Sequence, residues 1–114
     1  MTREELIAFE DEMAALFNAG QIKAPLHLVG GNENALIDIF KNIRPQDHIF
    51  CSWRSHYHAL LKGVPRELVK QRILEGRSIA LCFKEYRMLS SAIVGGICPI
   101  ATGVAWATCC GPSA

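Results

Sequence analysis

Residues 47–63 read DHIFCSWRSHYHALLKG, and this stretch decides the fold. The apolar run from Ile49 to Trp53 predicts a strand, which we expect to be buried on both faces because it shows no alternation. The pattern from about Ser55 to Leu61 predicts a short helix that stops at Gly63. Open α/β sheets build ligand sites in this way, with polar side chains beyond the carboxyl ends of buried strands.

The composition is that of a globular chain. The sequence has 114 residues, of which 50% are hydrophobic and 20% charged, and this excludes a disordered protein. The net charge of +1 gives no electrostatic reason to expect a nucleic-acid partner. The five cysteines include no Cys-x-x-Cys pair, so we expect small buried hydrophobes rather than a zinc site or a disulfide framework.

The first helix has clear signals at both ends. Thr2 and Glu5 form a capping box, and Gly20 is placed to end the helix. Spacings of three and four residues predict one inward face. Its members are Leu6, Phe9, Met13, Leu16 and Phe17.

The remaining segments are less regular. A second helix is predicted from about Asn32 to Asn42, with Ala35, Leu36, Ile39 and Phe40 facing inward. Pro65 suits the first turn of a helix that runs to about Leu74. The segment from Gly76 to Ser91 shows no period and is predicted as an irregular loop, extended between Ile79 and Phe83. A last helix is predicted from Pro99 to about Thr108.

The C-terminal quarter of the chain carries no charge. From Ser90 to Ala114 there is no acidic or basic residue, so a membrane span has to be weighed. Its glycines, proline and threonines lower its hydropathy and no Lys or Arg anchors its far end, which favours a buried turn and helix. The acidic, amphipathic N-terminus is unlike a secretory signal, so we expect a cytoplasmic protein without a membrane contact.

Arg54 is the strongest single candidate for ligand binding. Its guanidinium stays charged and can bind phosphate oxygens in pairs, and its place after a buried strand would make it rigid. The competing interpretation is a surface arginine paired with a neighbouring acid. His27, on a glycine-bearing loop, can hydrogen-bond a ligand oxygen or have no special role.

Three other features suggest chemistry but carry less weight. His56 and His58 form a His-x-His pair, but no third metal ligand is evident, and we predict no metal ligand in this chain. Cys51 lies near His56, but burial in a strand would raise its pKa and suppress its reactivity. Ser90 and Ser91 offer hydroxyls before a glycine-bearing turn, which is not a phosphate-binding loop motif.

Taken together, several short motifs in order resemble a known family over about residues 3–107. The chain resembles the alpha subunit of the thiamine-diphosphate-dependent dehydrogenase component of 2-oxo acid dehydrogenase complexes (pyruvate, branched-chain or acetoin type). The motifs are His27-Leu28, Gly31-Asn32-Glu33, Asp47-His48-Ile49, Trp53-Arg54-Ser55-His56, Leu61-Lys62-Gly63, Ile93-Val94-Gly95-Gly96 and Pro99-Ile100-Ala101-Thr102-Gly103-Val104-Ala105.

The resemblance implies a cofactor site for thiamine diphosphate with magnesium. The family's aromatic–arginine pair, which reaches the diphosphate, matches Trp53 and Arg54, with tryptophan where tyrosine is usual. The family's histidine near the diphosphate matches His27. The turn that contacts the aminopyrimidine ring through its backbone matches Ala92 to Gly95, including Val94, with Ala92 in place of a glycine.

The resemblance also implies a fold and an activity. The expected fold is α/β: a truncated thiamine-diphosphate-binding fold, helix-rich with a short parallel sheet, in one partial domain (1–114) with an atypical tail at 108–114. The expected activity is oxidative decarboxylation of a 2-oxo acid, with acyl transfer towards a lipoyl carrier. The family's Gly-Gly-Ser-Met-His is missing from the segment between Gly76 and Ser91.

We expect an N-terminal fragment of such a subunit. The family's Gly-Asp-Gly…Asn motif for magnesium and diphosphate lies beyond the matched residues, and the activating glutamate comes from a beta subunit. The chain alone is therefore predicted to be inactive and to need the beta subunit or self-association. The alternative is a non-catalytic interaction or self-associating protein, since a truncated sheet leaves an open edge and an apolar surface.

Overall fold

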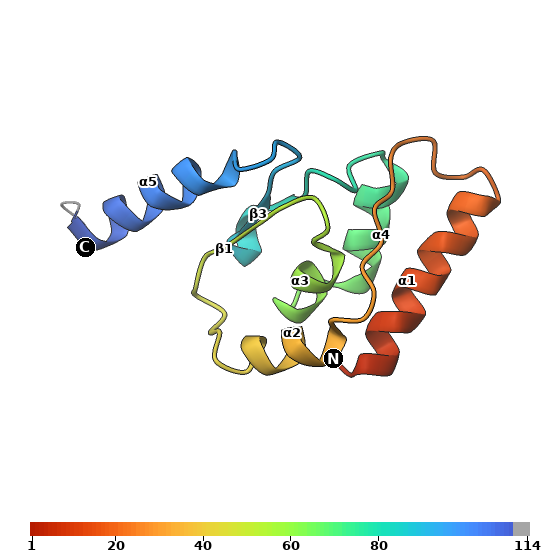
Figure 1. The fold of residues 1–114 in the computed structure, drawn as a ribbon, viewed down its shortest axis with the longest axis horizontal. Helices are drawn as coiled ribbons and strands as arrows, with labels where there is room; N and C mark the ends of the chain where they lie inside the picture. The colour runs from red at the N-terminus through yellow and green to blue at the C-terminus, as the bar shows by residue number, and fades with distance from the viewer. Residues whose placement is uncertain (111–114) are drawn as a thin grey trace.

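A computed structural model describes residues 1–110, which form a helix-rich α/β fold with a small sheet (Figure 1). The predicted fold class is confirmed. Its elements are α1 (Arg3–Asn18), α2 (Glu33–Phe40), β1 (Ile49–Cys51), α3 (His56–Leu61), α4 (Arg66–Leu74), β2 (Cys82–Phe83), the 3-10 turn η1 (Lys84–Tyr86), β3 (Met88–Ser90) and α5 (Ile97–Cys110).

Helix α1 begins at the predicted capping box. The Thr2 hydroxyl accepts the Glu5 amide at 3.2 Å, and the Glu5 carboxylate accepts the Thr2 amide at 3.1 Å. Leu6, Phe9 and Met13 are fully buried, which confirms most of the inward face. The prediction was wrong for Phe17, which lies in the last turn of the helix and is 46% exposed, whereas Leu16 beside it still packs against the core.

Helix α2 exists as predicted but turns a different face to the core. Leu36 is buried and Phe40 half-buried, whereas Ala35 and Ile39, both expected inside, are exposed. Glu33 takes an inward position instead. Its carboxylate can be buried because it accepts hydrogen bonds from the hydroxyl of Tyr57 and the amide of Gly31.

The sheet has three strands in the order β1-β3-β2. β1 pairs with β3 in parallel, with Ile49 opposite Met88 and Cys51 opposite Ser90, whereas β2 pairs with β3 antiparallel. The sheet is therefore mixed, and only one of its pairs has the predicted parallel direction. β1 is also shorter than predicted: it ends at Cys51 rather than Trp53, because β3 ends opposite it at Ser90.

Strand β1 is only partly buried. Cys51 is buried, while Ile49 and Phe50 are half-buried, so the prediction of burial on both faces was wrong. The segment predicted as an irregular loop also contains β2, η1 and β3, and β3 is the central strand. Strands of two or three residues are too short to show a sequence period.

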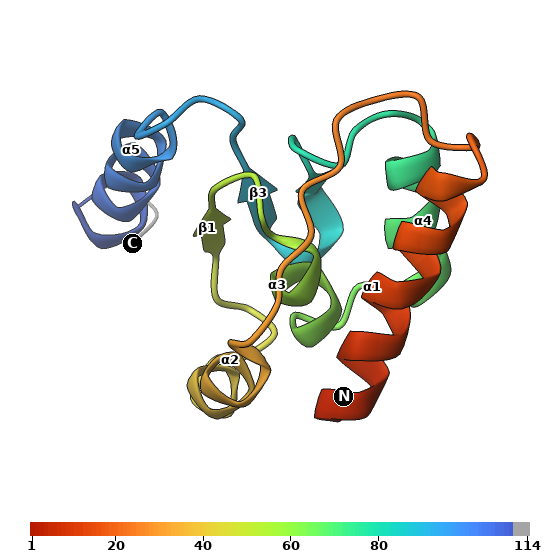
Figure 2. The same cartoon turned by 45° about the vertical axis from the view of Figure 1, so that its right-hand side comes forward.

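Helices lie on both sides of the sheet (Figure 2). α1 and α4 lie side by side, joined by the carboxylate of Glu12, which pairs with Arg66 and, at 2.8 Å, with Lys70. α3 lies between this pair and the sheet, and α5 lies beyond the other face of the sheet. The buried core is therefore on the α1, α3 and α4 side, where Phe9, Tyr57 and Ile73 are nearly or fully buried.

Helix α5 begins two residues before the predicted Pro99, at Ile97, and runs to Cys110. We expected the uncharged segment to be buried, but Ile93 and Val94, in the turn before α5, are 73% and 79% exposed, and Trp106 on α5 is 71% exposed, because no described element covers this turn or the outer side of α5. Residues 108–110 of the expected tail form the end of α5, and residues 111–114 lie outside the described part. None of the helices between residues 1 and 110 is long and apolar enough to cross a membrane.

The cysteines correct a second expectation about burial. Cys51 is buried, but Cys82, Cys98 and Cys109 are exposed. Cys82 lies on β2 at the edge of the sheet, and the last two lie on α5, so the lack of cover that exposes α5 also exposes them.

Candidate functional site

A hollow of about 290 Å³ lies at the carboxyl ends of β1 and β3. It is lined by His27, Trp53, Ile79, Ala92 and Val94, which come from four separate loops. Because β1 and β3 are parallel, the loops that follow them leave the sheet at the same edge, and this brings Trp53 towards Ala92 and Val94. This is the place where open α/β sheets hold their ligands.

The structure thus brings together four of the five residues that the sequence predicted for a cofactor site: His27, Trp53, Ala92 and Val94. The imidazole of His27 meets the indole of Trp53 edge to face, with ring centroids 6.5 Å apart and planes at 63°. His27 is exposed and Trp53 half-buried, so the histidine nitrogens remain within reach of a ligand. Whether these residues bind a cofactor stays a prediction.

Arg54, the fifth residue, does not line the hollow. It follows Trp53 in the turn between β1 and α3, and its side chain is exposed. Within the part of the chain that the structure describes, Arg54 forms no ion pair with an acid, unlike Arg44, Arg66 and Arg72. The competing interpretation, an arginine paired with a neighbouring acid, is therefore not what this geometry shows.

The turn that carries Ala92 and Val94 depends on two glycines. Gly95 has a φ of 73°, which side chains other than glycine rarely adopt. A Cβ at Gly96 would lie 2.9 Å from the Cβ of Ile93, so a side chain there would collide with it. The Ser91 hydroxyl accepts the Ile93 amide at 3.2 Å, and the turn presents Val94 to solvent at the rim of the hollow.

A buried polar cluster that the sequence did not reveal joins α1, α3 and the segment after α4. His56 Nδ1 lies 3.2 Å from Glu10 Oε1, and His56 Nε2 lies 2.8 Å from Ser78 Oγ. Both ring nitrogens are therefore engaged within the protein, which leaves none for the metal considered for His56 and His58. The three partners are 46 and 22 residues apart along the chain, so no local pattern could have shown them.

None of the protein-family models matches this chain, but curated proteins do. Pyruvate dehydrogenase E1 component subunit alpha-3 from Arabidopsis thaliana, a chloroplast protein, is 30% identical over 111 residues, which cover 89% of this chain and 26% of that protein. The corresponding alpha subunit of Porphyra purpurea is 28% identical over 108 residues, covering 86% and 31%. The alpha subunit of acetoin:2,6-dichlorophenolindophenol oxidoreductase from Bacillus subtilis is 28% identical over 78 residues, covering 68% and 23%.

This chain is a homologue of E1 alpha subunits. The predicted resemblance to this family is therefore confirmed. The E1 alpha homologue spans between 26% and 33% of the length of the pyruvate dehydrogenase subunits it matches. Two of these relatives are named as chloroplastic and one as mitochondrial, so the cytoplasmic location stays a prediction.

Burial and hydrogen bonds shift the pKa values of several groups in this E1 alpha homologue. Burial raises the pKa of the Cys51 thiol to about 12, in agreement with the expectation that Cys51 is not a nucleophile. It also lowers the pKa of His58. The pKa of Glu33 is lowered, first by a hydrogen bond from its own backbone amide and then by those from Gly31 and Tyr57. The Tyr57 pKa is raised by burial and by its bond to Glu33.

The family resemblance implies a magnesium ion, but the described residues of this homologue contain no group of side chains arranged to bind one. Within residues 1–110, no three His, Cys, Asp or Glu side chains are grouped so that they could hold a metal ion. The hollow itself has aromatic and aliphatic walls, and its polar side-chain groups are the imidazole of His27 and the indole N–H of Trp53. Such a lining suits an aromatic ring better than a metal ion.

Proposed function

We propose that this chain forms part of the thiamine-diphosphate site of a 2-oxo acid dehydrogenase and acts there together with a beta subunit. The observation that carries the proposal is the convergence of His27, Trp53, Ala92 and Val94 on one hollow at the carboxyl edge of a sheet. The homology to E1 alpha subunits supports it. A specific 2-oxo acid is not part of the proposal.

The volume of the hollow fits part of the cofactor. Ligand pockets usually measure about 300–1,000 Å³, and this one, at about 290 Å³, reaches only the lower limit. Its apolar walls, Trp53 and Ile79 among them, suit one ring. A complete site would then need further surface, which the proposal assigns to the beta subunit and to the rest of a full-length alpha subunit.

Each residue has a separate task in this proposal. Val94, on the exposed turn, offers backbone groups to the aminopyrimidine ring. His27 contacts Trp53 and donates a hydrogen bond to the diphosphate. Arg54 follows Trp53 in the sequence and neutralises part of the diphosphate charge. The bound cofactor supplies the electron sink for decarboxylation. The described residues bind and orient it, and the described part of this chain supplies no group that we assign to a proton transfer.

Titration calorimetry with thiamine diphosphate and magnesium tests the proposal. We expect saturable binding to the folded chain, and an affinity about 10- to 100-fold lower in Arg54→Ala, because bonds to a charged group are worth about 1.5–3 kcal/mol. Arg3→Ala is the matched control: Arg3 is equally exposed but lies in the first turn of α1 and does not line the hollow. It should bind like the wild type.

Two results would contradict the proposal. If a well-folded wild-type chain gives no binding heat, either alone or with a beta subunit, the chain does not bind thiamine diphosphate and the proposed function is wrong. If Arg54→Ala and Arg3→Ala lose the same amount of affinity for thiamine diphosphate, the loss reflects the change in net charge and not a contact made by Arg54.

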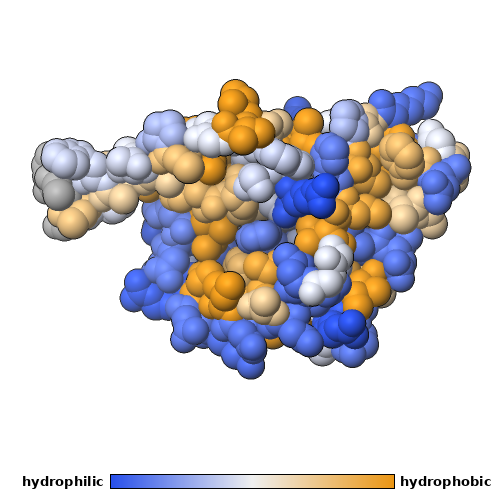
Figure 3. All heavy atoms as spheres, viewed as in Figure 1, coloured by the Kyte–Doolittle hydropathy of each residue, from blue (hydrophilic) through white to orange (hydrophobic). Residues whose placement is uncertain are grey.

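A second candidate function is self-association through α5. The segment from Ile93 to Cys109 exposes apolar side chains and carries no charge. Figure 3 shows apolar side chains gathered at the surface where the chain turns into α5. Such a surface is typical of an interaction site.

Sedimentation velocity separates this candidate from a monomeric cofactor site. We expect oligomers that dissociate on dilution, and Trp106→Glu should shift the chain towards monomer because it places a charge on the exposed side of α5. Glu67→Ala, a change at an exposed position of α4, is the control and should leave the distribution unchanged. A wild-type chain that is monomeric at all concentrations would contradict self-association.

A further inference from the structure

The cluster formed by Glu10, His56 and Ser78 links three elements of the fold. Glu10 belongs to α1, His56 opens α3, and Ser78 follows α4. All three are buried: His56 and Ser78 are 0% exposed and Glu10 is 4% exposed. A carboxylate can only accept a hydrogen bond, so His56 Nδ1 donates to Glu10 Oε1, and Ser78 pairs with the opposite ring nitrogen.

Each member of the cluster is linked, through the chain or by a hydrogen bond, to a segment that carries one wall of the hollow. Glu10 Oε1 also accepts the amide of Val29, at 3.5 Å, and Val29 follows His27 by two residues. His56 follows Trp53 by three residues, and Ser78 directly precedes Ile79. The walls made by His27, Trp53 and Ile79 are therefore all connected through one imidazole ring.

The contacts follow the order of a Ser–His–acid triad, but the cluster has no nucleophilic role. The hydroxyl of Ser78 is fully buried, so no substrate can approach it. None of the three side chains lines the hollow. Any influence of the cluster on a ligand must therefore pass through the loops that it holds.

We infer that Glu10, His56 and Ser78 form a positioning unit that fixes His27, Trp53 and Ile79 relative to one another. Loops are otherwise the most mobile parts of a fold, and a ligand site on loops needs such a rigid support. Buried polar groups that are hydrogen-bonded to one another hold neighbouring segments in one arrangement, because separating them would leave further buried atoms unpaired, in addition to Oε2 of Glu10, which has no partner among the described residues. That this support serves a cofactor rests on the proposed function, whereas the support itself does not.

Fluorine NMR of the full chain labelled with 5-fluorotryptophan tests the unit without a ligand. The chain has two tryptophans. Trp53 lies in the hollow, and Trp106 lies exposed on α5, where it serves as an internal reference. In Ser78→Ala and Glu10→Met, we expect the Trp53 resonance to shift or broaden while that of Trp106 stays in place.

Two further variants separate positioning from a general loss of stability. Glu10→Gln keeps an oxygen that can accept from both His56 and Val29, so it should retain the wild-type Trp53 resonance where Glu10→Met does not. Ile73→Val trims a fully buried side chain of α4 that does not line the hollow, so it should lower stability without moving Trp53. If Glu10→Met does not fold, Ser78→Ala decides alone.

Cofactor binding is measured separately from the Trp53 resonance. With thiamine diphosphate and magnesium, Ser78→Ala should bind about tenfold more weakly, which corresponds to about 1.4 kcal/mol. If the wild type binds no cofactor but Trp53 responds as described, the proposed function fails and the positioning unit stands. A wild-type Trp53 resonance in folded Ser78→Ala, or a shift in Ile73→Val as large as that in Ser78→Ala, would overturn the inference.

Discussion

Replacing Phe9 with alanine is expected to lower the free energy of unfolding by about 3–5 kcal/mol, the usual cost of removing a buried aromatic side chain. Phe9 is 0% exposed, meets the imidazole of His56 edge to face at 6.4 Å, and lies beneath the guanidinium of Arg66 at 5.5 Å. The total free energy of unfolding of a domain is only about 5–15 kcal/mol, so this loss would be a large part of it. Urea unfolding followed by circular dichroism measures the change.

Phe17→Ala is the matched control on the same helix. Phe17 is 46% exposed, so its removal should cost less than about 1 kcal/mol. The sequence pattern assigns both phenylalanines to one inward face, and the structure separates them. If both variants lose the same free energy of unfolding, Phe17 packs as tightly as Phe9, which would contradict its exposed position.

The helices could be predicted because their signals are local. The capping box at Thr2, the proline before α4 and the spacing of apolar side chains act within a few residues. The face of α2 could not be predicted in the same way. Burial of Glu33 depends on Tyr57, 24 residues further along, and this contact brings a charged residue inside while Ile39 remains exposed.

The candidate site, like the helices, could be predicted in part, and the rest depends on contacts between distant segments. The sequence predicted that Trp53 and Val94 share a site, and the parallel pairing of β1 with β3 explains why they converge. Ile79 and the cluster of Glu10, His56 and Ser78 were missed because their contacts join distant segments. The exposure of α5 could not be predicted either, since an uncharged sequence does not reveal whether another element covers it.

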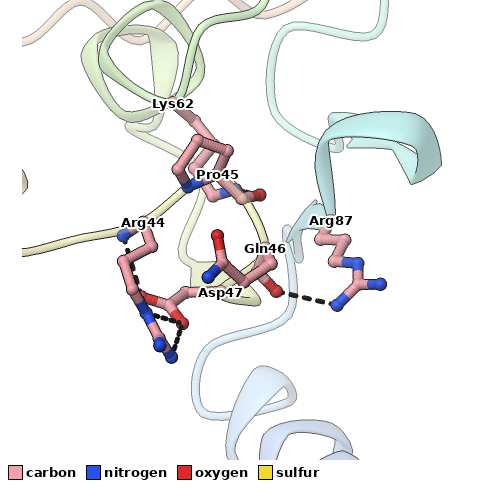
Figure 4. A network of polar contacts seen from close by, with 6 residues as sticks. All are labelled: Arg44, Pro45, Gln46, Asp47, Lys62 and Arg87. Carbon is pink, nitrogen blue, oxygen red and sulfur yellow. Dashed lines mark hydrogen bonds and ion pairs between the residues drawn. The ribbon is translucent and has the colours of Figure 1, made fainter.

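Lys62 is the second position where a large effect is expected. It follows α3 and is only 8% exposed, and its Nζ donates to the carbonyl oxygens of Pro45 at 2.7 Å and Tyr86 at 2.9 Å. Figure 4 shows the surrounding loop, where Arg44 pairs with Asp47 and Arg87 reaches the carbonyl of Gln46 at 2.8 Å. The bond from Arg44 holds the pKa of Asp47 below its usual value. Lys62 thus joins the segment before β1 to the segment before β3.

Lys62→Met should therefore lower the free energy of unfolding by about 2–4 kcal/mol, since each carbonyl left without a partner costs about 1–3 kcal/mol. Methionine keeps most of the aliphatic stem, so the change isolates the loss of the ammonium group. Lys41→Met is the control, because Lys41 forms only an exposed ion pair with Asp38, with side chains 69% and 72% exposed. That pair should contribute less than about 1 kcal/mol. If urea unfolding gives the same loss of free energy of unfolding for both variants, Lys62 does not hold the segments before β1 and β3 together. In that case the parallel register of these strands rests on their backbone hydrogen bonds alone.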